Sequence, residues 1–250
     1  MKRIVLITGA GSGIGRSTAL RLSKNGYRII LNGRNESALS EIQDQINTIA
    51  GEKISETVIG SITDIETTEK MIQKAYDTWN TAPSVLIANA GISLPGSVTN
   101  SDDTKWDNLI NTNFIGLMNQ LRVFSLEATN VMDGITKDIV VIGSNIGRNV
   151  SPFNSVYGAT KFAAYGVTEG LRRELAPKGI RVSLIEPGMV QTNLQATAGY
   201  DMEWFKNYEA EIGPILSGED IAQTIDFILS LPGNVTVDSL SIRPTRQVYP

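Results

Sequence analysis

The stretch IVLITGAGSGIG, residues 4–15, decides the fold of this chain. It begins with a continuous apolar run, which is typical of a buried parallel strand, and ends in a glycine-rich turn. An amphipathic segment then starts at Gly13. Glycine lacks a Cβ atom, so the backbone of the turn can bend tightly and approach a pyrophosphate group at a helix N-terminus. A strand, a glycine-rich turn and a helix in this order predict a dinucleotide-binding crossover.

Short apolar runs alternate with longer amphipathic segments along the rest of the chain. The expected strands cover residues 2–8, 28–32, 54–59, 85–89, 139–144, 181–186 and 237–242. The expected helices cover residues 13–25, 35–50, 66–79, 103–127, 155–177 and 218–231. This alternation predicts an α/β fold: one Rossmann-type domain over residues 1–250, with a doubly wound parallel sheet of about seven strands and helices on both faces.

The composition narrows the possible functions. An apolar fraction of 41% and a charged fraction of 19% are ordinary for a soluble globular protein. The net charge is −4 and no block of lysine or arginine occurs, so nucleic acid is not expected as a partner. Cysteine and histidine are both absent, which excludes disulfides and argues against a metal site. Any acid–base chemistry must therefore use Tyr, Lys, Asp or Glu.

The N-terminal residues Met1-Lys2-Arg3 resemble the start of a signal peptide, but the apolar run after them ends at Thr8-Gly9, which is too short for an h-region. No later stretch approaches the roughly 20 apolar residues of a membrane span. The sequence therefore favours a cytoplasmic protein without a membrane partner.

A second pattern joins Ser144 to Tyr157 and Lys161, the last two within YGATK. Residues four apart on a helix share a face, about 5–6 Å apart at Cβ. The ammonium group should therefore lie beside the phenol and lower its pKa. A shift from about 10 towards 7 takes roughly 4 kcal/mol, which one charge about 4 Å away supplies at an effective dielectric constant near 20. We therefore expect Tyr157 to exchange a proton near neutral pH.

The end of the second expected strand predicts which dinucleotide binds. It reads Leu31-Asn32-Gly33-Arg34, without the acidic residue that NAD sites usually place there. A carboxylate would repel a 2′-phosphate, whereas a guanidinium can bind it through several N–H groups. The sequence therefore favours NADP. The alternative is that Arg34 only solvates the start of the next helix, which would leave NAD as the cofactor.

One connection is longer than the others. Residues 189–216 carry the aromatic residues Tyr200, Trp204, Phe205 and Tyr208. A long connection at the carboxyl end of a strand is often a lid over a binding site, and we interpret this segment as a substrate lid. The alternative is a pair of surface helices that bury the aromatic side chains.

The glycine-rich turn belongs to a set of motifs that resemble the short-chain dehydrogenase/reductase family. Asn89-Ala90-Gly91 matches the family's NAG sequence, which steadies the central strand beside the cofactor. Where family members commonly carry an aspartate near the adenine ring, this chain has Ser61, and Asp64 is expected to cap the next helix. The resemblance implies a cofactor site made of Thr8, Gly9, Ser12, Gly13, Ile14, Gly15, Arg34, Ser61, Ile62, Asn89, Ala90, Gly91, Tyr157, Lys161, Pro187, Gly188, Val190 and Thr192.

The resemblance also assigns catalytic roles to Asn113, Ser144, Tyr157 and Lys161, with Ser144 at the family's usual separation from Tyr157. Tyr157 would donate a proton to a carbonyl or accept one from an alcohol, and Ser144 would hold the carbonyl oxygen. Lys161 would bind the nicotinamide ribose, and Asn113 would anchor a water that links Lys161 to solvent. The implied enzyme is an NADP-dependent oxidoreductase that interconverts an alcohol and a ketone or aldehyde by hydride transfer.

The substrate is expected to contact Ser144, Asn145, Phe153, Asn154 and Tyr157, with Arg148 also close in sequence. This mixture favours a small or medium polar alcohol or carbonyl. The C-terminal stretch SLSIRPTRQ resembles a subgroup of the family that acts on short hydroxy acids and simple alcohols. By the same resemblance, the helices at 103–127 and 155–177 would join copies of the chain into a homotetramer or a homodimer.

Two other functions stay open. A dinucleotide-binding sensor or scaffold would bind the cofactor without turnover, although it has no need of all four catalytic residues. An NAD-dependent epimerase-like enzyme also uses Tyr and Lys, but such chains usually carry a larger C-terminal domain than the roughly 60 residues that follow Pro187.

Overall fold

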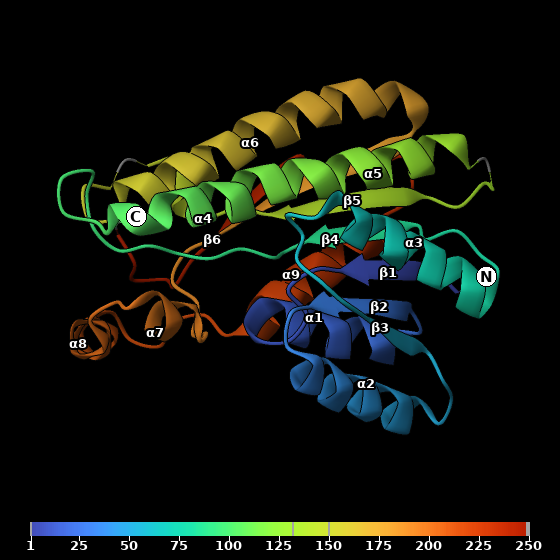
Figure 1. Ribbon diagram of the computed structural model, residues 1–250, viewed down its shortest axis with the longest axis horizontal. Coiled ribbons are helices and arrows are strands. Elements are labelled where there is room, and N and C mark those ends of the chain that lie inside the picture. Colours follow the sequence, from blue (N-terminus) through green and yellow to red (C-terminus); the bar gives the residue numbers. More distant parts are fainter. Residues whose placement is uncertain (1, 132, 150, 249–250) are drawn as a thin grey trace.

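The computed structural model describes residues 2–131, 133–149 and 151–248 (Figure 1). In this part of the chain, seven strands form one parallel sheet in the order β3-β2-β1-β4-β5-β6-β7. The strands are β1 (Ile4–Ile7), β2 (Arg28–Gly33), β3 (Ser55–Ile59), β4 (Val85–Ala88), β5 (Lys137–Ile142), β6 (Ile180–Pro187) and β7 (Ser239–Ile242). The predicted fold class is confirmed. Positions 1, 132, 150, 249 and 250 of the predicted 1–250 domain lie outside the described residues.

Helices cover both faces of the sheet because successive side chains of each strand point to opposite faces. Val5 and Ile7 face one core, which is shared with α1 (Gly13–Lys24), α2 (Glu36–Ala50) and α9 (Gly218–Ser230). Ile4 and Leu6 face the other core, which is shared with α3 (Ile65–Trp79), α5 (Gly116–Asn130) and α6 (Ser155–Leu175). Figure 1 shows these two helical layers on opposite sides of the sheet.

The order of the strands determines where a binding crevice forms. It reverses between β1 and β4, and the carboxyl ends of neighbouring parallel strands leave a crevice at such a point. The glycine-rich turn after β1 and the loop after β4 both open into this crevice.

The expected helix at 103–127 is interrupted in the structure. A 3₁₀ turn (Asp103–Lys105) and α4 (Trp106–Ile110) come first, and a π-helical turn (Asn111–Ile115) then leads into α5. Such π turns often mark functional sites. This one contains Asn113, whose side chain forms hydrogen bonds with a loop and a neighbouring helix. The periodicity of apolar residues predicts neither the turn nor these contacts with distant residues.

The segment 189–216 forms two helices, α7 (Leu194–Ala198) and α8 (Met202–Ile212), which project from the sheet (Figure 1). The ends of the segment meet at a bridge between Val190 and Leu216. Its aromatic side chains are not simply buried, because they line the cavity described below and Trp204 is 54% exposed. No helix among the described residues is both long enough and apolar enough to cross a bilayer.

Candidate active site

A cavity of about 1130 Å³ opens at the carboxyl ends of the strands. Its walls come from the glycine-rich turn, the ends of β2 and β3, the loop after β4, the start of α6 and the segment 189–216. The cavity therefore collects most of the residues that the sequence motifs single out.

The glycine-rich turn is held against the loop after β4. The Asn89 side chain donates hydrogen bonds to the carbonyl oxygens of Thr8 (2.9 Å) and Gly9 (3.2 Å). Gly9 has a φ of +63°, and a Cβ atom on Gly15 would lie 2.3 Å from the Gly9 carbonyl oxygen. Both positions therefore require glycine. The turn leads into α1, whose first turn carries no acidic side chain. An anion at this helix N-terminus would meet unopposed N–H groups.

Arg34 and Asn32 stand at the end of β2. Asn32 is buried and donates hydrogen bonds to the carbonyl oxygens of Val58 (3.0 Å) and Gly60 (3.2 Å). Its side chain is thus used to join β2 to β3. Arg34 is exposed at the rim of the cavity, and no ion pair holds it within the described part of the chain. A guanidinium in this position is available for an anionic group at the rim.

Tyr157 and Lys161 lie one turn apart on α6, with the Lys161 Nζ atom 5.8 Å from the centre of the Tyr157 ring. Lys161 donates a hydrogen bond to the carbonyl oxygen of Ile142 at the end of β5 (3.0 Å). Ser144 lies just beyond that strand end, where its hydroxyl accepts a hydrogen bond from the Ile146 N–H at 3.4 Å. Ser144 also hydrogen bonds with Tyr157. The predicted juxtaposition of the hydroxyl, the phenol and the ammonium is therefore present.

The predicted effect of Lys161 on the phenol is wrong for this structure. Removal from water raises the pKa of Tyr157 above its ordinary value of 10, the nearby Tyr200 raises it further, and the hydrogen bond with Ser144 lowers it. Burial also lowers the pKa of Lys161 from 10.5 to about 8. The physical reason is desolvation, which disfavours the charged form of both groups. The sequence spacing cannot reveal this burial.

Asn113 is only 5% exposed, and its side-chain amide makes three hydrogen bonds. Its Oδ1 atom accepts a hydrogen bond from the Ile92 N–H (2.8 Å), while Nδ2 donates to the Ile92 carbonyl oxygen (2.8 Å) and to the Thr160 hydroxyl (3.1 Å). Asn113 does not line the cavity. It fixes the loop after β4 to α6, and its Oδ1 atom borders Gly91 together with the Lys161 ammonium. A carbonyl-type oxygen has two lone pairs, so Oδ1 can accept one further hydrogen bond.

Comparison with known proteins agrees with this geometry. A family model described as short chain dehydrogenase matches residues 3–203. The chain belongs to the short-chain dehydrogenase family. An uncharacterized oxidoreductase of Staphylococcus epidermidis is 32% identical over 243 residues, which are 97% of each chain.

Two solved structures extend this likeness to the fold. The closed form of a serine dehydrogenase complexed with NADP⁺ has a TM-score of 0.86 and 26% identity, over 98% of this chain and 96% of that one. A dehydrogenase/reductase from Sinorhizobium meliloti has a TM-score of 0.82 and 27% identity, over 96% and 93% of the two chains. The chain is therefore an oxidoreductase of the short-chain dehydrogenase family with that family's single-domain fold.

The residues that the family motifs assign to the cofactor fall into two groups. Thr8 and Gly15 do not line the cavity. Thr8 is buried behind the turn, where its hydroxyl donates to Gln120 and accepts from the Ala90 N–H (3.1 Å), and Gly15 lets the turn close. The others line the cavity: Gly9, Ser12, Gly13, Ile14, Arg34, Ser61, Ile62, Asn89, Ala90, Gly91, Tyr157, Lys161, Pro187, Gly188, Val190 and Thr192.

The turn after β3 differs in one detail from the prediction. Asp64 occupies the N-cap position of α3, as expected, but its side chain makes no capping hydrogen bond. Ser61 bonds locally with the Thr63 hydroxyl at 2.8 Å while it lines the cavity.

All five predicted substrate residues line the cavity: Ser144, Asn145, Phe153, Asn154 and Tyr157. Arg148 does not. Its guanidinium binds the buried Glu186 carboxylate with Nε at 2.7 Å from both oxygens, and it stacks on Tyr165 at 4.6 Å. Arg148 is therefore directed away from the cavity, because its guanidinium is paired with Glu186 at the end of β6.

The cavity lining also includes Ser93, Ser151 and Gln247, which were not among the individually predicted site residues. Gln247 belongs to the C-terminal stretch, and its Oε1 atom accepts a hydrogen bond from the Met189 N–H at 2.9 Å. No periodicity or spacing links position 247 to 189. Ser93 lies within residues 91–95, directly after the NAG motif, where the sequence already placed one border of the pocket.

Proposed function

We propose that this enzyme is an NADP-dependent oxidoreductase that interconverts an alcohol and a ketone or aldehyde by hydride transfer. The observation that carries the proposal is the shared cavity. It holds the Ser144, Tyr157 and Lys161 side chains together with the glycine-rich turn and Arg34. Proton-transfer groups and a dinucleotide cradle in one cavity are what carbonyl reduction requires.

Each residue of the site would have its own role in this reaction. Tyr157 donates its proton to the carbonyl oxygen in reduction and accepts one from the alcohol in oxidation. Ser144 donates a hydrogen bond to the same oxygen, where negative charge develops. Lys161 supplies positive charge beside the phenol, and Asn113 fixes the loop that borders Lys161 and offers a lone pair for a relay water. The bound nicotinamide supplies or receives the hydride.

The residues present fit such a cofactor. The close approach of Gly9 to the loop after β4 and the absence of acidic side chains at the start of α1 suit a pyrophosphate. Arg34 suits a 2′-phosphate, since it is exposed at the rim without an ion pair among the described residues. Ser61 and Ile62 would border the adenine, and residues 187–192 the nicotinamide. The NADP⁺ bound by the similar serine dehydrogenase supports this choice.

The substrate side of the cavity favours a neutral compound. It presents amides, hydroxyls and aromatic rings: Ser93, Asn145, Ser151, Phe153, Asn154, Tyr200, Trp204, Phe205, Tyr208 and Gln247. Among the described residues, the charged ones that line the cavity are Arg34, Lys161 and Asp201. The Asp201 carboxylate caps α8, since it accepts hydrogen bonds from the N–H groups of Glu203 and Trp204. A carboxylate buried without a cation is costly. We therefore propose a neutral carbonyl substrate instead of the short hydroxy acid that the C-terminal resemblance suggests.

A matched pair of substrates tests the proposal. NADPH oxidation is followed with methyl benzoylformate and with benzoylformate, which share the reacting carbonyl and the ring but differ in charge. We expect kcat/KM for the ester to exceed that for the acid about 100-fold, because the acid leaves its carboxylate unpaired. A preference for the acid would contradict the neutral pocket. If NADPH binds but no carbonyl is reduced, the sensor alternative gains support. Cofactor retained through purification would favour the epimerase-like alternative.

The pH dependence follows from Lys161. Its pKa is lowered from 10.5 to about 8, so the ammonium charge is present below that pH and is lost as the pH rises through it. We expect kcat/KM for carbonyl reduction to fall above pH 8. Arginine does not deprotonate in this range, so Lys161→Arg should keep whatever activity it has up to pH 10. A wild-type profile that stays flat to pH 10 would show that the charge on Lys161 is not required.

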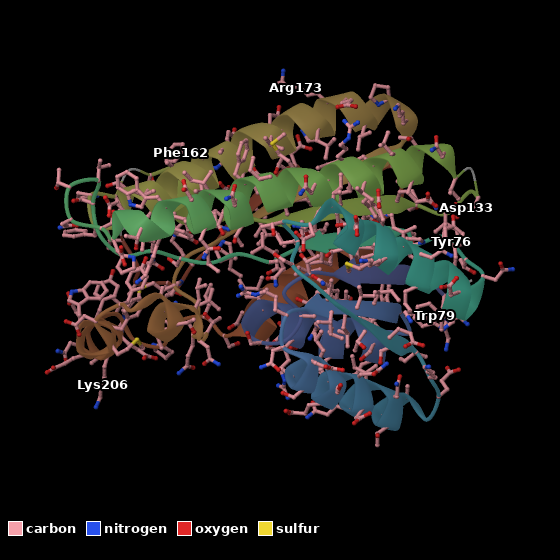
Figure 2. All side chains as sticks on the ribbon, viewed as in Figure 1. Tyr76, Trp79, Asp133, Phe162, Arg173 and Lys206 are labelled. Carbon is pink, nitrogen blue, oxygen red and sulfur yellow. The ribbon has the colours of Figure 1, made fainter. Side chains whose placement is uncertain are left out.

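We also propose that the chain assembles into a homotetramer or homodimer through the outer faces of α4, α5 and α6. These helices and the π turn between α4 and α5 expose large apolar side chains: Ile110, Ile115, Met118, Leu126, Phe162 and Tyr165. Figure 2 shows Phe162 on the side of α6 that faces away from the sheet. Exposed apolar side chains gathered on neighbouring helices are typical of protein interfaces. Light scattering on the purified protein would measure the assembly.

A further inference from the structure

The hydroxyl of Tyr200 links three segments that are distant in sequence. Tyr200 lies between α7 and α8 and lines the cavity. Its hydroxyl is 2.9 Å from the Ser93 hydroxyl in the loop after β4, and it accepts a hydrogen bond from Asn154 Nδ2 at 3.4 Å. Asn154 is the N-cap residue of α6, three positions before Tyr157. The Ser93, Tyr200 and Asn154 side chains therefore form a chain of hydrogen bonds across one side of the cavity.

Few other buried contacts hold this part of the segment 189–216. Its two ends are joined by the Val190–Leu216 bridge and by a hydrogen bond from the Gln191 N–H to the Leu216 carbonyl oxygen at 2.7 Å. Between those ends, α7 contains no buried residue within the described chain, and α8 buries only Ile212. A segment with so little buried apolar surface opens at low free-energy cost. Side-chain hydrogen bonds to the body of the protein therefore have a large influence on its position.

The bonded position of Tyr200 is next to the reacting group. Its proximity contributes to the raised pKa of Tyr157, second only to burial. The bond to Asn154 also uses the amide nitrogen of that residue. The Oδ1 atom of Asn154 is buried and has no hydrogen-bond partner among the described residues, so the bond to Tyr200 is the contact that orients this amide. The Ser93–Tyr200–Asn154 chain thus completes the wall of the substrate pocket.

We propose that Tyr200 is a positioning residue for this enzyme. By bonding to Ser93 and Asn154, it holds the segment 189–216 over the cavity and fixes the Asn154 side chain in the cavity wall. The inference rests on the proposed function for its kinetic consequences, but the position of the segment can be measured without turnover.

Tryptic cleavage after Lys206 reports the position of the segment, because Lys206 is the only lysine or arginine between residues 189 and 216. Figure 2 shows Lys206 on the outer side of α8, away from the sheet. When opening and closing are fast, the cleavage rate follows the population of the open form. We expect Tyr200→Phe to increase the rate of cleavage at Lys206 about fivefold, which is the population change for one hydrogen bond of ordinary net strength.

Two further variants make this measurement specific. Ser93→Ala removes the same bond from the other side, so it should give a similar increase, and the double variant should add little to either single change. Tyr27→Phe is the control, because it also removes a tyrosine hydroxyl but Tyr27 does not line the cavity. It should leave the rate of cleavage at Lys206 unchanged. Equal cleavage rates in wild type, Tyr200→Phe and Ser93→Ala would overturn the proposal.

The kinetic readout separates positioning from general stability. With methyl benzoylformate as substrate, Tyr200→Phe should raise KM about fivefold, in line with the lost bond, while the Kd for NADPH changes less than about twofold. An unchanged KM would also overturn the proposal. If wild type binds NADPH but reduces no carbonyl, the proposed function fails, whereas a faster cleavage at Lys206 in Tyr200→Phe would still support the role of Tyr200 in holding the segment.

Discussion

Tyr157→Phe is expected to lower the rate of carbonyl reduction about 1000-fold, within the range that general acid catalysis contributes, and to leave the affinity for NADPH unchanged. Phenylalanine keeps the aromatic ring on α6 but cannot donate a proton or bond to Ser144. Lys161 remains hydrogen bonded to the Ile142 carbonyl oxygen, so the cofactor side of the cavity should keep its shape. The loss should therefore appear in kcat and not in cofactor binding.

The measurement is a pair of titrations, one of turnover against substrate and one of NADPH binding by fluorescence. Tyr165→Phe is the matched control, because Tyr165 is on the same helix but is exposed and lies outside the cavity lining. Its activity should equal that of wild type. If Tyr157→Phe retains more than about a tenth of the wild-type rate, Tyr157 is not the general acid.

Arg34→Glu is expected to weaken NADPH binding about 100-fold while changing the affinity for NADH less than threefold. The guanidinium offers charge-assisted hydrogen bonds to a 2′-phosphate, and a carboxylate in its place repels that phosphate. NADH has no phosphate there, so the substitution removes nothing specific from its site. The two affinities are measured by fluorescence titration of the same preparation.

Arg16→Glu provides the charge-matched control for this experiment. Arg16 lies on α1 outside the cavity lining, where it bonds to Gln45 at 3.0 Å. Arg16→Glu changes the net charge by the same amount as Arg34→Glu. It therefore shows how much of any loss in NADPH affinity comes from the overall charge of the protein and how much from the local contact of Arg34. Equal losses for NADPH and NADH in Arg34→Glu would show that Arg34 does not recognise the 2′-phosphate, and the cofactor choice would then pass to NAD.

Burial makes the chemistry of Tyr157 and Lys161 more demanding than their spacing suggests. The phenol resists losing its proton, so its pKa moves away from neutral pH, whereas the pKa of the Lys161 ammonium falls to about 8. A neutral phenol still suits a proton donor in carbonyl reduction. In the reverse direction, Tyr157 must lose its proton before it can accept one, which favours reduction near neutral pH in the proposed reaction.

The local patterns in the sequence predicted the order of the secondary structure because those patterns depend on neighbours in the chain. Apolar runs such as residues 4–7 predict strands that are covered on both faces, and the alternation with helical segments supplies that cover. The glycines of the first crossover allow backbone positions that other residues would not. The spacing of Tyr157 and Lys161 predicted a shared helix face, and the structure places the ammonium against the ring. These features require no knowledge of the tertiary arrangement.

The tertiary structure alone decided which distant side chains meet. Three features join residues that no short-range pattern connects. They are the ion pair between Arg148 and Glu186, the π turn that contains Asn113, and the hydrogen bond between Gln247 and Met189. The direction of the Tyr157 pKa shift belongs to the same class, because desolvation depends on everything packed around a group and not on its neighbours in sequence. The sequence by itself therefore determined the sheet, the turn and the catalytic residue types. The order of the strands and the packing at their carboxyl ends determined the shape, the charge and the side-chain contacts of the cavity.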